Sequence, residues 1–307
     1  MYTELTDEEL VKRIRELKEA KNAIILAHYY QNEDIQDLAD YLGDSFGLSR
    51  KAACTDADII VFCGVRFMAE SAAILSPDKK VLIPEITAGC SLAETVNVEG
   101  LRRMKRKYPD YTVVTYVNST AAVKAESDVC CTSSNALKIV EAVDSDRILF
   151  VPDRNIGLFV ASQTQKKVIV WDGYCKTHLL PEIEDVKKIK RLYPEAPLLV
   201  HPECRPEIIA LADFTGSTAE ILKYVRKSSL NGFIIGTEEG IMYQLKKENT
   251  DKNFYPLIPQ MICHDMKKIT LEKVLFSLEN NEYRIKIEEE VRGKAYEALK
   301  RMMELAR

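Results

Sequence analysis

The sequence contains no apolar run that approaches the roughly 20 residues a membrane-spanning helix needs. It also has no large excess of charge, because 43 Lys and Arg oppose 47 Asp and Glu and leave a net charge of -4. This balance gives no overall attraction to nucleic acid or to anionic membranes. The first residues, MYTELTDEELVKR, include early acids and no apolar core like that of a signal peptide. We therefore expect a cytoplasmic protein with neither nucleic acid nor membrane as a partner.

Glycine-rich phosphate loops are missing as well. Neither G-x-G-x-x-G nor G-x-x-x-x-G-K-S/T occurs, so dinucleotide and nucleoside-triphosphate chemistry has no supporting motif. The closely spaced cysteine run of ferredoxins is also absent, which disfavours simple electron transfer. Eight cysteines are nevertheless present, and in a reducing compartment they indicate thiols or metal ligands and not a disulfide framework.

One unit of sequence occurs three times. Residues 13–31, 102–120 and 187–205 each contain a basic helix end, a break, an apolar strand and then polar residues. Equivalent points are marked by Asp40, Asp128 and Asp213, which are 88 and then 85 residues apart. Each copy continues with a second buried strand, in DIIVFCG, RILFVPD and GFIIGTE, and a third apolar run, in VLIPEI, VIVWDG and FYPLIP. Self-similarity at a fixed period of this kind indicates repeated domains.

The repeat predicts an α/β protein of three pseudo-symmetric, three-layer α/β/α domains. Short β-branched strands alternate with amphipathic, helix-length stretches, as in parallel sheets covered on both faces. The predicted domains are residues 1–95, 96–180 and 181–267, and the charged, helical pattern of 268–307 predicts C-terminal helices packed on the body. Thr6 with Glu9 fits a capping box, and Pro181 fits a first helical position.

A cysteine follows the last apolar run of each copy. Cys90, Cys175 and Cys263 are 85 and then 88 residues apart, which matches the repeat. Three equivalent loops would bring three thiolates to one axis, and this suits three corners of a 4Fe-4S cluster. No fourth equivalent cysteine exists, so one iron would stay open as a Lewis acid. The remaining cysteines are interpreted as core or near-site thiols: Cys54, Cys63, Cys130, Cys131 and Cys204.

Polar residues follow the first strand of every copy, where parallel sheets bind ligands. They are His28 and Tyr30, Tyr116 and Asn118, and His201 and Glu203. Further along each copy, hydroxyls lie near expected helix N-termini, at Ser45, Ser133, Ser217 and Thr218. Free backbone N–H groups and hydroxyls there can bind carboxylate or phosphate oxygens. The three copies together predict a pocket for a small poly-anion.

Two other interpretations use the same residues. The pairs Cys175/His178, His201/Cys204 and Cys263/His264 could supply mixed ligands to the zinc ion of a hydrolase, although Cys90 has no histidine near it. A non-catalytic iron–sulfur sensor would use the three cysteines but would not need the polar strand ends. His178 has no counterpart in the other copies, so we expect it to form local hydrogen bonds and not to bind the metal.

The ordered motifs resemble those of the quinolinate synthase family, the iron–sulfur enzymes of NAD biosynthesis. The resemblance covers essentially the whole chain and rests on AHYYQ, LADYLGDS, GVRFMAE, TYVNS, TSSNA, WDGYCKTH, HPEC, GSTAEIL and CHDMKKITLEKVLFSLE. It implies three homologous domains around a central 4Fe-4S cluster. It also implies that iminoaspartate, supplied by an aspartate oxidase or dehydrogenase, condenses with dihydroxyacetone phosphate to give quinolinate, phosphate and water.

The resemblance also implies roles for individual residues. Cys90, Cys175 and Cys263 would be the cluster ligands. Tyr30 would transfer a proton, and Glu203 would be a base with His201 beside it. The substrate contacts would be made by His28, Ser45, Tyr116, Asn118, Ser133, His201, Glu203, Ser217 and Thr218.

Overall fold

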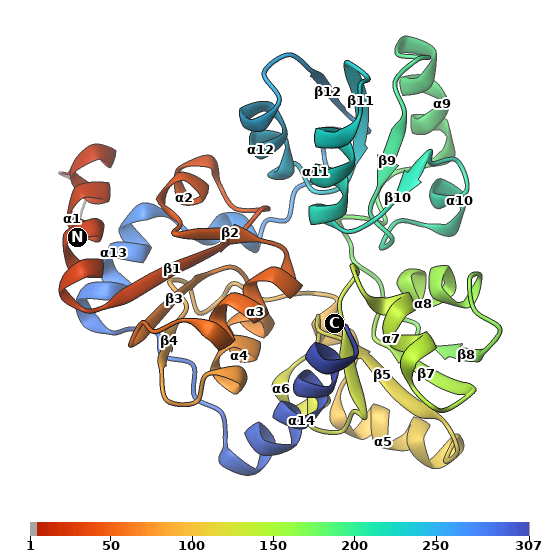
Figure 1. Cartoon of the computed structure of the whole chain (residues 1–307), viewed down its shortest axis with the longest axis horizontal. Helices are drawn as coiled ribbons and strands as arrows, with labels where there is room; N and C mark the ends of the chain where they lie inside the picture. Colours follow the sequence, from red (N-terminus) through yellow and green to blue (C-terminus); the bar gives the residue numbers. More distant parts are fainter. Residues whose placement is uncertain (1–4, 307) are drawn as a thin grey trace.

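The computed structural model describes residues 5–306 and contains three four-stranded parallel sheets with the same strand order (Figure 1). In each, the second strand of the repeat forms one edge and is followed by the first, third and fourth strands. The first sheet contains β1 (Ala23–His28), β2 (Tyr41–Gly43), β3 (Ile59–Cys63) and β4 (Lys80–Leu82). The second contains β5 (Thr112–Tyr116), β6 (Val129–Cys131), β7 (Arg147–Val151) and β8 (Lys167–Val170). The third contains β9 (Leu198–Val200), β10 (Phe214–Thr215), β11 (Gly232–Gly236) and β12 (Asn253–Pro256).

Helices connect the strands of each sheet. Those of the first repeat are α1 (Asp7–Ala20), α2 (Glu33–Leu38), α3 (Ser45–Cys54), α4 (Arg66–Leu75) and the 3-10 turn η1 (Ala93–Thr95). The second repeat has α5 (Val98–Lys107), α6 (Ala121–Lys124), α7 (Ala136–Ala142) and α8 (Arg154–Ala161). The third has α9 (Ile183–Leu192), α10 (Pro206–Ile209), α11 (Thr218–Lys227), α12 (Ile241–Glu248) and the 3-10 turn η2 (Met266–Lys268).

Both faces of each sheet are covered, as the predicted three-layer class requires. In the first sheet, Ile25 and Ala27 of β1 pack on one side with α1, α2 and α13, while Leu26 packs on the other with α3 and α4. Successive side chains of a strand point to opposite faces, so a strand covered on both sides is apolar throughout. The predicted triple α/β/α architecture is therefore confirmed.

The repeated aspartates form the same side-chain-to-backbone hydrogen bond in each domain. The side-chain Oδ2 atoms of Asp40, Asp128 and Asp213 accept hydrogen bonds from the backbone N–H of Ile25, Val113 and Leu198, at 2.8, 2.7 and 2.7 Å. Each aspartate thus joins the start of the second strand of its repeat to the first strand. This equivalence supports the register in which the three copies were aligned.

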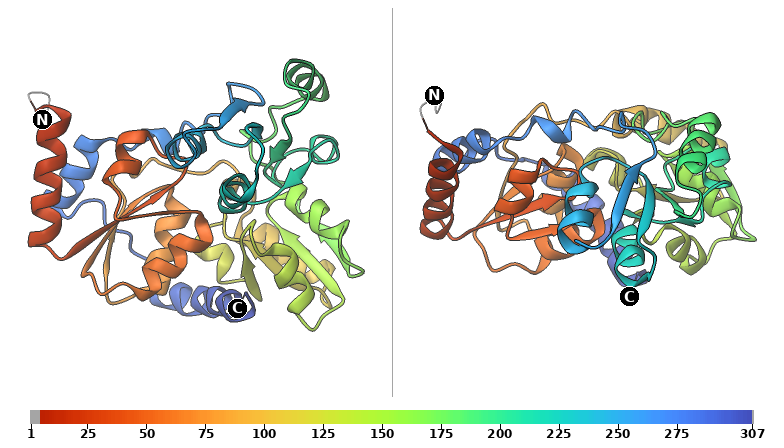
Figure 2. Two further views of the ribbon diagram at one scale, coloured as in Figure 1. Left: turned by 45° about the horizontal axis from the view of Figure 1, so that its top comes forward. Right: turned by 90° about the horizontal axis from the view of Figure 1, so that it is seen from above.

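The C-terminal segment forms α13 (Leu271–Asn280) and α14 (Glu289–Leu305). Helix α13 packs beside α1 on the first domain, and α14 packs against α4, α6 and β6, between the first two domains (Figure 2). One large apolar cluster therefore runs through the first and second domains, whereas the third domain has two clusters mainly of its own. The exact domain boundaries stay a prediction.

Two predicted helix starts have different outcomes. The capping box of Thr6 and Glu9 is confirmed at the start of α1. The placement of Pro181 in the first turn of a helix is wrong, because α9 begins at Ile183 with Glu182 as its N-cap. Glu182 and Asp185 form a capping box of their own, which supplies the start signal instead. Among the residues described, no helix is both long and apolar enough to cross a membrane.

Candidate active site

A cavity of about 230 Å³ lies where the three domains meet, and residues at or just after the first strand of every sheet line it. His28 ends β1, Tyr116 ends β5, and His201 directly follows β9. The cavity brings together every predicted site residue except Ser217. The parallel sheets explain this convergence, because the carboxyl ends of their strands all face the centre.

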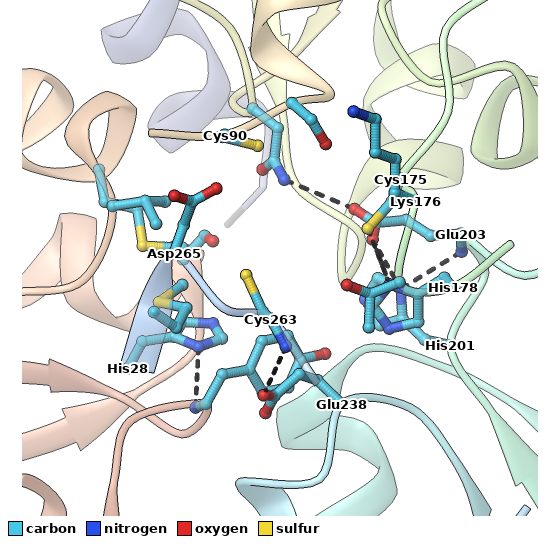
Figure 3. Close-up of a pocket in the computed structure, with 18 of the residues that line it drawn as sticks. His28, Cys90, Cys175, Lys176, His178, His201, Glu203, Glu238, Cys263 and Asp265 are labelled. Carbon is cyan, nitrogen blue, oxygen red and sulfur yellow. Dashed lines mark hydrogen bonds and ion pairs between the residues drawn. The ribbon is translucent and has the colours of Figure 1, made fainter. Parts of the chain in front are cut away.

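The three predicted sulfur donors lie on loops of equivalent geometry that surround this cavity (Figure 3). In each loop the carbonyl of Cys90, Cys175 or Cys263 accepts the backbone N–H of the residue four positions later, at 3.2, 3.0 and 3.2 Å. Burial raises the pKa of Cys90 to about 12 and that of Cys263 to about 11, and it raises the pKa of Cys175 well above its ordinary value. Without a metal these thiols are protonated, and a metal that binds them must displace the protons.

This donor set fits an iron–sulfur cluster. The three thiols come from three separate domains, and no other cysteine of residues 5–306 lines the cavity. Cys63, Cys130, Cys131 and Cys204 are fully buried in the hydrophobic cores, which agrees with their predicted role as core thiols. Cys54 departs from that prediction, because it is exposed at the end of α3.

Glu203 is the centre of a buried hydrogen-bond network. Its Oε1 accepts the Tyr116 hydroxyl at 2.8 Å and lies 3.5 Å from the Asn118 amide nitrogen. Its Oε2 lies 2.7 Å from His178 Nδ1 and 3.8 Å from His201 Nδ1. Burial raises the pKa of Glu203. His178, His201 and Tyr116 together lower it by more than burial raises it, so the pKa falls to about 2. The carboxylate is therefore ionised at neutral pH.

His178 has the local hydrogen-bonding role that its lack of a counterpart predicted. Its Nδ1 lies 3.3 Å from the Cys175 sulfur as well as beside Glu203, and its Nε2 lies 2.9 Å from the Thr237 hydroxyl. The ring is only 2% exposed. His178 therefore connects a sulfur donor with the central carboxylate.

Tyr30 is held by two threonines. Thr218 donates to the Tyr30 hydroxyl at 2.9 Å, and the Thr237 hydroxyl lies 2.7 Å from the same oxygen. Burial raises the pKa of Tyr30 well above its ordinary value, so the phenol keeps its proton. With Thr218 as the donor, the Tyr30 proton is free to bond to Thr237 or to a substrate atom.

His28 and His201 occupy equivalent positions and have equivalent hydrogen bonds. The Nδ1 atom of His28 accepts the Tyr30 backbone N–H at 3.1 Å, and that of His201 accepts the Glu203 backbone N–H at 3.3 Å. Burial lowers the pKa of both rings to about 3. Each ring is therefore neutral and carries its proton on Nε2, which can donate to an anionic oxygen.

The predicted hydroxyls separate into two groups. Ser45, Ser133 and Thr218 line the cavity. The Ser217 hydroxyl instead accepts the Glu220 backbone N–H at 3.3 Å as the N-cap of α11, and its side chain is fully buried. Ser217 was predicted to contact substrate, but its geometry is that of a helix cap because Glu220 completes a capping box.

Only one of the three histidine–cysteine pairs could bind a single ion. Cys175, His178 and Glu203 each place one ligand atom within 4.8 Å of the others. Cys204, by contrast, packs in the core of the third domain, with its sulfur 3.5 Å from the Gly236 carbonyl. His264 lines the cavity but is exposed. Among the described residues, the mixed-ligand alternative is thus reduced to one candidate site, formed by Cys175, His178 and Glu203.

The sequence analysis missed Thr237 and Glu238. Thr237 contacts both Tyr30 and His178, and Glu238 lines the cavity with no exposed surface. A signal was present, because Glu238 in GFIIGTE occupies the repeat position of Asp153 in RILFVPD, 85 residues earlier. An acid thus follows the second buried strand at equivalent positions of the second and third repeats.

The neutral histidines make stability depend on pH. As pH falls through 6.5, histidines in the unfolded chain bind protons, whereas His28 and His201 in the folded chain do not until about pH 3. The contribution of these two histidines to the free energy of unfolding is therefore fully present above pH 6.5 and is lost as pH falls toward 3. At about pH 5 the loss is about 2 kcal/mol for each histidine. Urea unfolding of the cluster-free chain at about pH 7.5 and about pH 5 measures it. His28→Asn should lose about 2 kcal/mol less stability than the parent between the two pH values, and the same loss in both proteins would contradict the prediction.

Gly173 allows the loop of Cys175 to lie close to its neighbours. A Cβ at this position would overlap the Thr95 hydroxyl and the backbone carbonyl of Pro152. Gly173→Ala should therefore lower the free energy of unfolding by about 1–3 kcal/mol, the usual effect of overpacking. Thermal unfolding measures the change. Gly293→Ala on α14 is the control, because a Cβ there meets nothing within 4 Å, and comparable melting temperatures for the two variants would contradict this account.

Known proteins resemble this chain over nearly its full length. Residues 12–304 match the family described as Quinolinate synthetase A protein. The chain is 56% identical to the quinolinate synthase of Caldicellulosiruptor saccharolyticus, over 97% of this chain and 99% of the relative. It is 53% identical to that of Thermodesulfovibrio yellowstonii, over 96% and 98% of the two chains. It is 50% identical to quinolinate synthase 1 of Methanosarcina acetivorans, over 96% and 97%. The chain belongs to the quinolinate synthetase A family.

Proposed function

We propose that this chain is a quinolinate synthase that condenses iminoaspartate with dihydroxyacetone phosphate, giving quinolinate, phosphate and water, in NAD biosynthesis. The observation that carries the proposal is the convergence of three thiols and three polar strand ends on one cavity. Similarity over nearly the full length to quinolinate synthases supports it. An enzyme that oxidises aspartate, either an oxidase or a dehydrogenase, would supply the unstable imine.

Cys90, Cys175 and Cys263 would hold a 4Fe-4S cluster with one iron free of protein sulfur. The family is one of iron–sulfur enzymes, and the three buried thiols are soft donors of the kind such clusters use. The bound cluster would supply a Lewis acid that assists the loss of hydroxyl groups in the dehydrations.

Neutral donors around the cavity would bind the anionic substrates. His28 and His201 offer Nε2–H groups, and Ser45, Ser133 and Thr218 offer hydroxyls. Hydrogen bonds from neutral donors to carboxylate and phosphate oxygens are strong in a site that excludes water. His28 and Ser45 are assigned to a substrate carboxylate, and Ser133 and Thr218 to further anionic oxygens.

Tyr30 is the proposed donor and acceptor of the proton in the ketose-to-aldose rearrangement. Its buried phenol is positioned by Thr218 and Thr237 and keeps its proton until substrate binds. Tyr116 and Asn118 reach the cavity from the end of β5 and would orient the intermediate. Both already contact Glu203, so they also fix the orientation of its carboxylate.

Glu203 is the proposed base of the late dehydration, with His201 beside it. In the cavity without substrate the carboxylate is ionised but only weakly basic, since its pKa is about 2. Substrate carboxylates that enter the cavity bring like charge close to it, and like charge raises the pKa of a carboxylate. Binding would therefore move Glu203 toward the basicity that proton abstraction needs.

The proposal is tested by anaerobic purification followed by iron, sulfide and zinc analysis and by turnover. We expect iron with sulfide, and formation of quinolinate from iminoaspartate and dihydroxyacetone phosphate. Iron and sulfide without turnover would favour the sensor interpretation instead. Zinc without sulfide would favour a hydrolase, for which Cys175, His178 and Glu203 are the described residues whose ligand atoms lie close enough.

A further inference from the structure

Glu238 is a buried carboxylate that binds two separate backbone segments at the edge of the cavity. Its Oε1 accepts the backbone N–H of Cys263 at 3.0 Å (Figure 3). Its Oε2 accepts the backbone N–H of Gly240 at 2.7 Å. The side chain has no exposed surface, so both bonds are protected from water. The loop of the third sulfur donor is thus attached through this side chain to the end of β11.

Lys267 extends this connection to Tyr30. Its ammonium lies 3.2 Å from Glu238 Oε1 and donates to the Tyr30 backbone carbonyl at 2.9 Å. The Lys267 side chain is only 18% exposed. A chain of charge-assisted hydrogen bonds therefore runs from the Cys263 N–H through Glu238 and Lys267 to Tyr30.

The Gly240 end of the same carboxylate also reaches the Tyr30 segment. A Cβ on Gly240 would lie 2.7 Å from the Tyr30 Cα atom and 2.8 Å from the Tyr29 carbonyl, so the two backbones are in direct contact. The Gln36 amide nitrogen bridges the two segments, because it donates to the carbonyls of Tyr29 and Gly240 at 3.0 and 2.9 Å. Glu238 is thus connected to the Tyr30 segment both through Lys267 and through Gly240.

We propose that Glu238 is a positioning residue that fixes the Cys263 loop and the Tyr30 segment relative to each other, through Lys267 and Gly240. The inference deepens the proposed function, on which it rests for the roles of Cys263 and Tyr30. The third domain shares little apolar core with the first. The hydrogen bonds through Glu238 and Lys267 therefore set the position of Tyr30 relative to Thr218 and Thr237.

Thiol alkylation of the full-length, cluster-free chain tests the Cys263 end. In Glu238→Gln one oxygen becomes an amide group, so the N–H of Cys263 or that of Gly240 loses its acceptor. The ion pair with Lys267 is lost in both cases, so the Cys263 loop is released from its attachment whichever way the amide is oriented. Cys263 should then react with iodoacetamide about tenfold faster, the factor that the loss of one buried hydrogen bond gives. Mass spectrometry of the peptides follows each cysteine, with Cys90 and Cys175 in the same molecule as references.

The matched control is Glu239→Gln, which makes the same change at the neighbouring, exposed acid. Its Cys263 should react at the parental rate. An unchanged Cys263 rate in Glu238→Gln would overturn the proposal. Equal acceleration of Cys90, Cys175 and Cys263 would also overturn it, because Glu238 would then contribute only to overall stability. These readings need no turnover, so they stand even if the proposed function fails.

Lys267→Met tests the connection to Tyr30. Lys267 is partly exposed, so this variant should fold even if Glu238→Gln does not. We expect kcat to fall about tenfold, with KM within about twofold and an unchanged iron content, because substrate contacts remain while Tyr30 loses its support. Lys267→Arg should restore most of kcat. A parental kcat in Lys267→Met, or an increase in KM alone, would overturn the connection to Tyr30.

Discussion

Replacing Cys175 by serine should abolish assembly of the iron–sulfur cluster. The three proposed donors lie on equivalent loops of three domains, and among the described residues no other cysteine lines the cavity to replace a lost one. A serine hydroxyl is a hard and weakly acidic ligand that cannot match a thiolate toward iron. Anaerobic reconstitution followed by iron and sulfide analysis should therefore show close to no bound cluster, with loss of its visible absorption.

His178→Ala is the matched comparison for Cys175→Ser. His178 lies only 3.3 Å from the Cys175 sulfur, so it tests whether the neighbouring ring is itself a ligand. We expect parental iron and sulfide, because the histidine bonds to Glu203 and Thr237 and has no counterpart in the other two repeats. Activity should fall, since Glu203 loses its closest partner. Loss of iron in both variants would instead indicate a paired Cys175–His178 metal site.

The repeat explains why so much of the fold could be predicted from the sequence. The equivalence of Asp40, Asp128 and Asp213 was predicted from the similar segments around them and from their spacing, and each accepts a hydrogen bond from the same backbone position of its sheet. Strands covered on both faces are continuously apolar, so their position in the sequence was clear. The same register brought Cys90, Cys175 and Cys263 to one cavity.

Features that depend on contacts between domains could not be predicted in the same way. Thr237 joins Tyr30 to His178, although these residues belong to three different domains and are far apart in the sequence. The role of Ser217 could not be predicted either, because a serine before a helix can bind an anion or cap the helix. Here Ser217 caps the helix, since it forms a capping box with Glu220. Cys54 is the last residue of α3 and is exposed.

Glu203→Gln should lower kcat by about 10²- to 10⁴-fold, the range that general acid–base groups contribute. Glutamine has nearly the same shape and can still accept the Tyr116 hydroxyl, but it cannot take a proton. It would also turn an amide N–H₂ toward His178 Nδ1, which lies 2.7 Å from the carboxylate in the parent. Steady-state turnover of iminoaspartate with dihydroxyacetone phosphate measures the loss, with iron content determined on the same samples.

The iron content decides what a loss of activity means for Glu203. The proposed cluster ligands are the three thiols and not this carboxylate, so the variant should keep its cluster while it loses kcat. Glu207→Gln, at an exposed acid on the neighbouring helix α10, is the control and should keep parental turnover. Full turnover of Glu203→Gln with an intact cluster would remove the base assignment. Loss of the cluster would show that Glu203 helps to retain iron, because a proton acceptor alone has no effect on assembly.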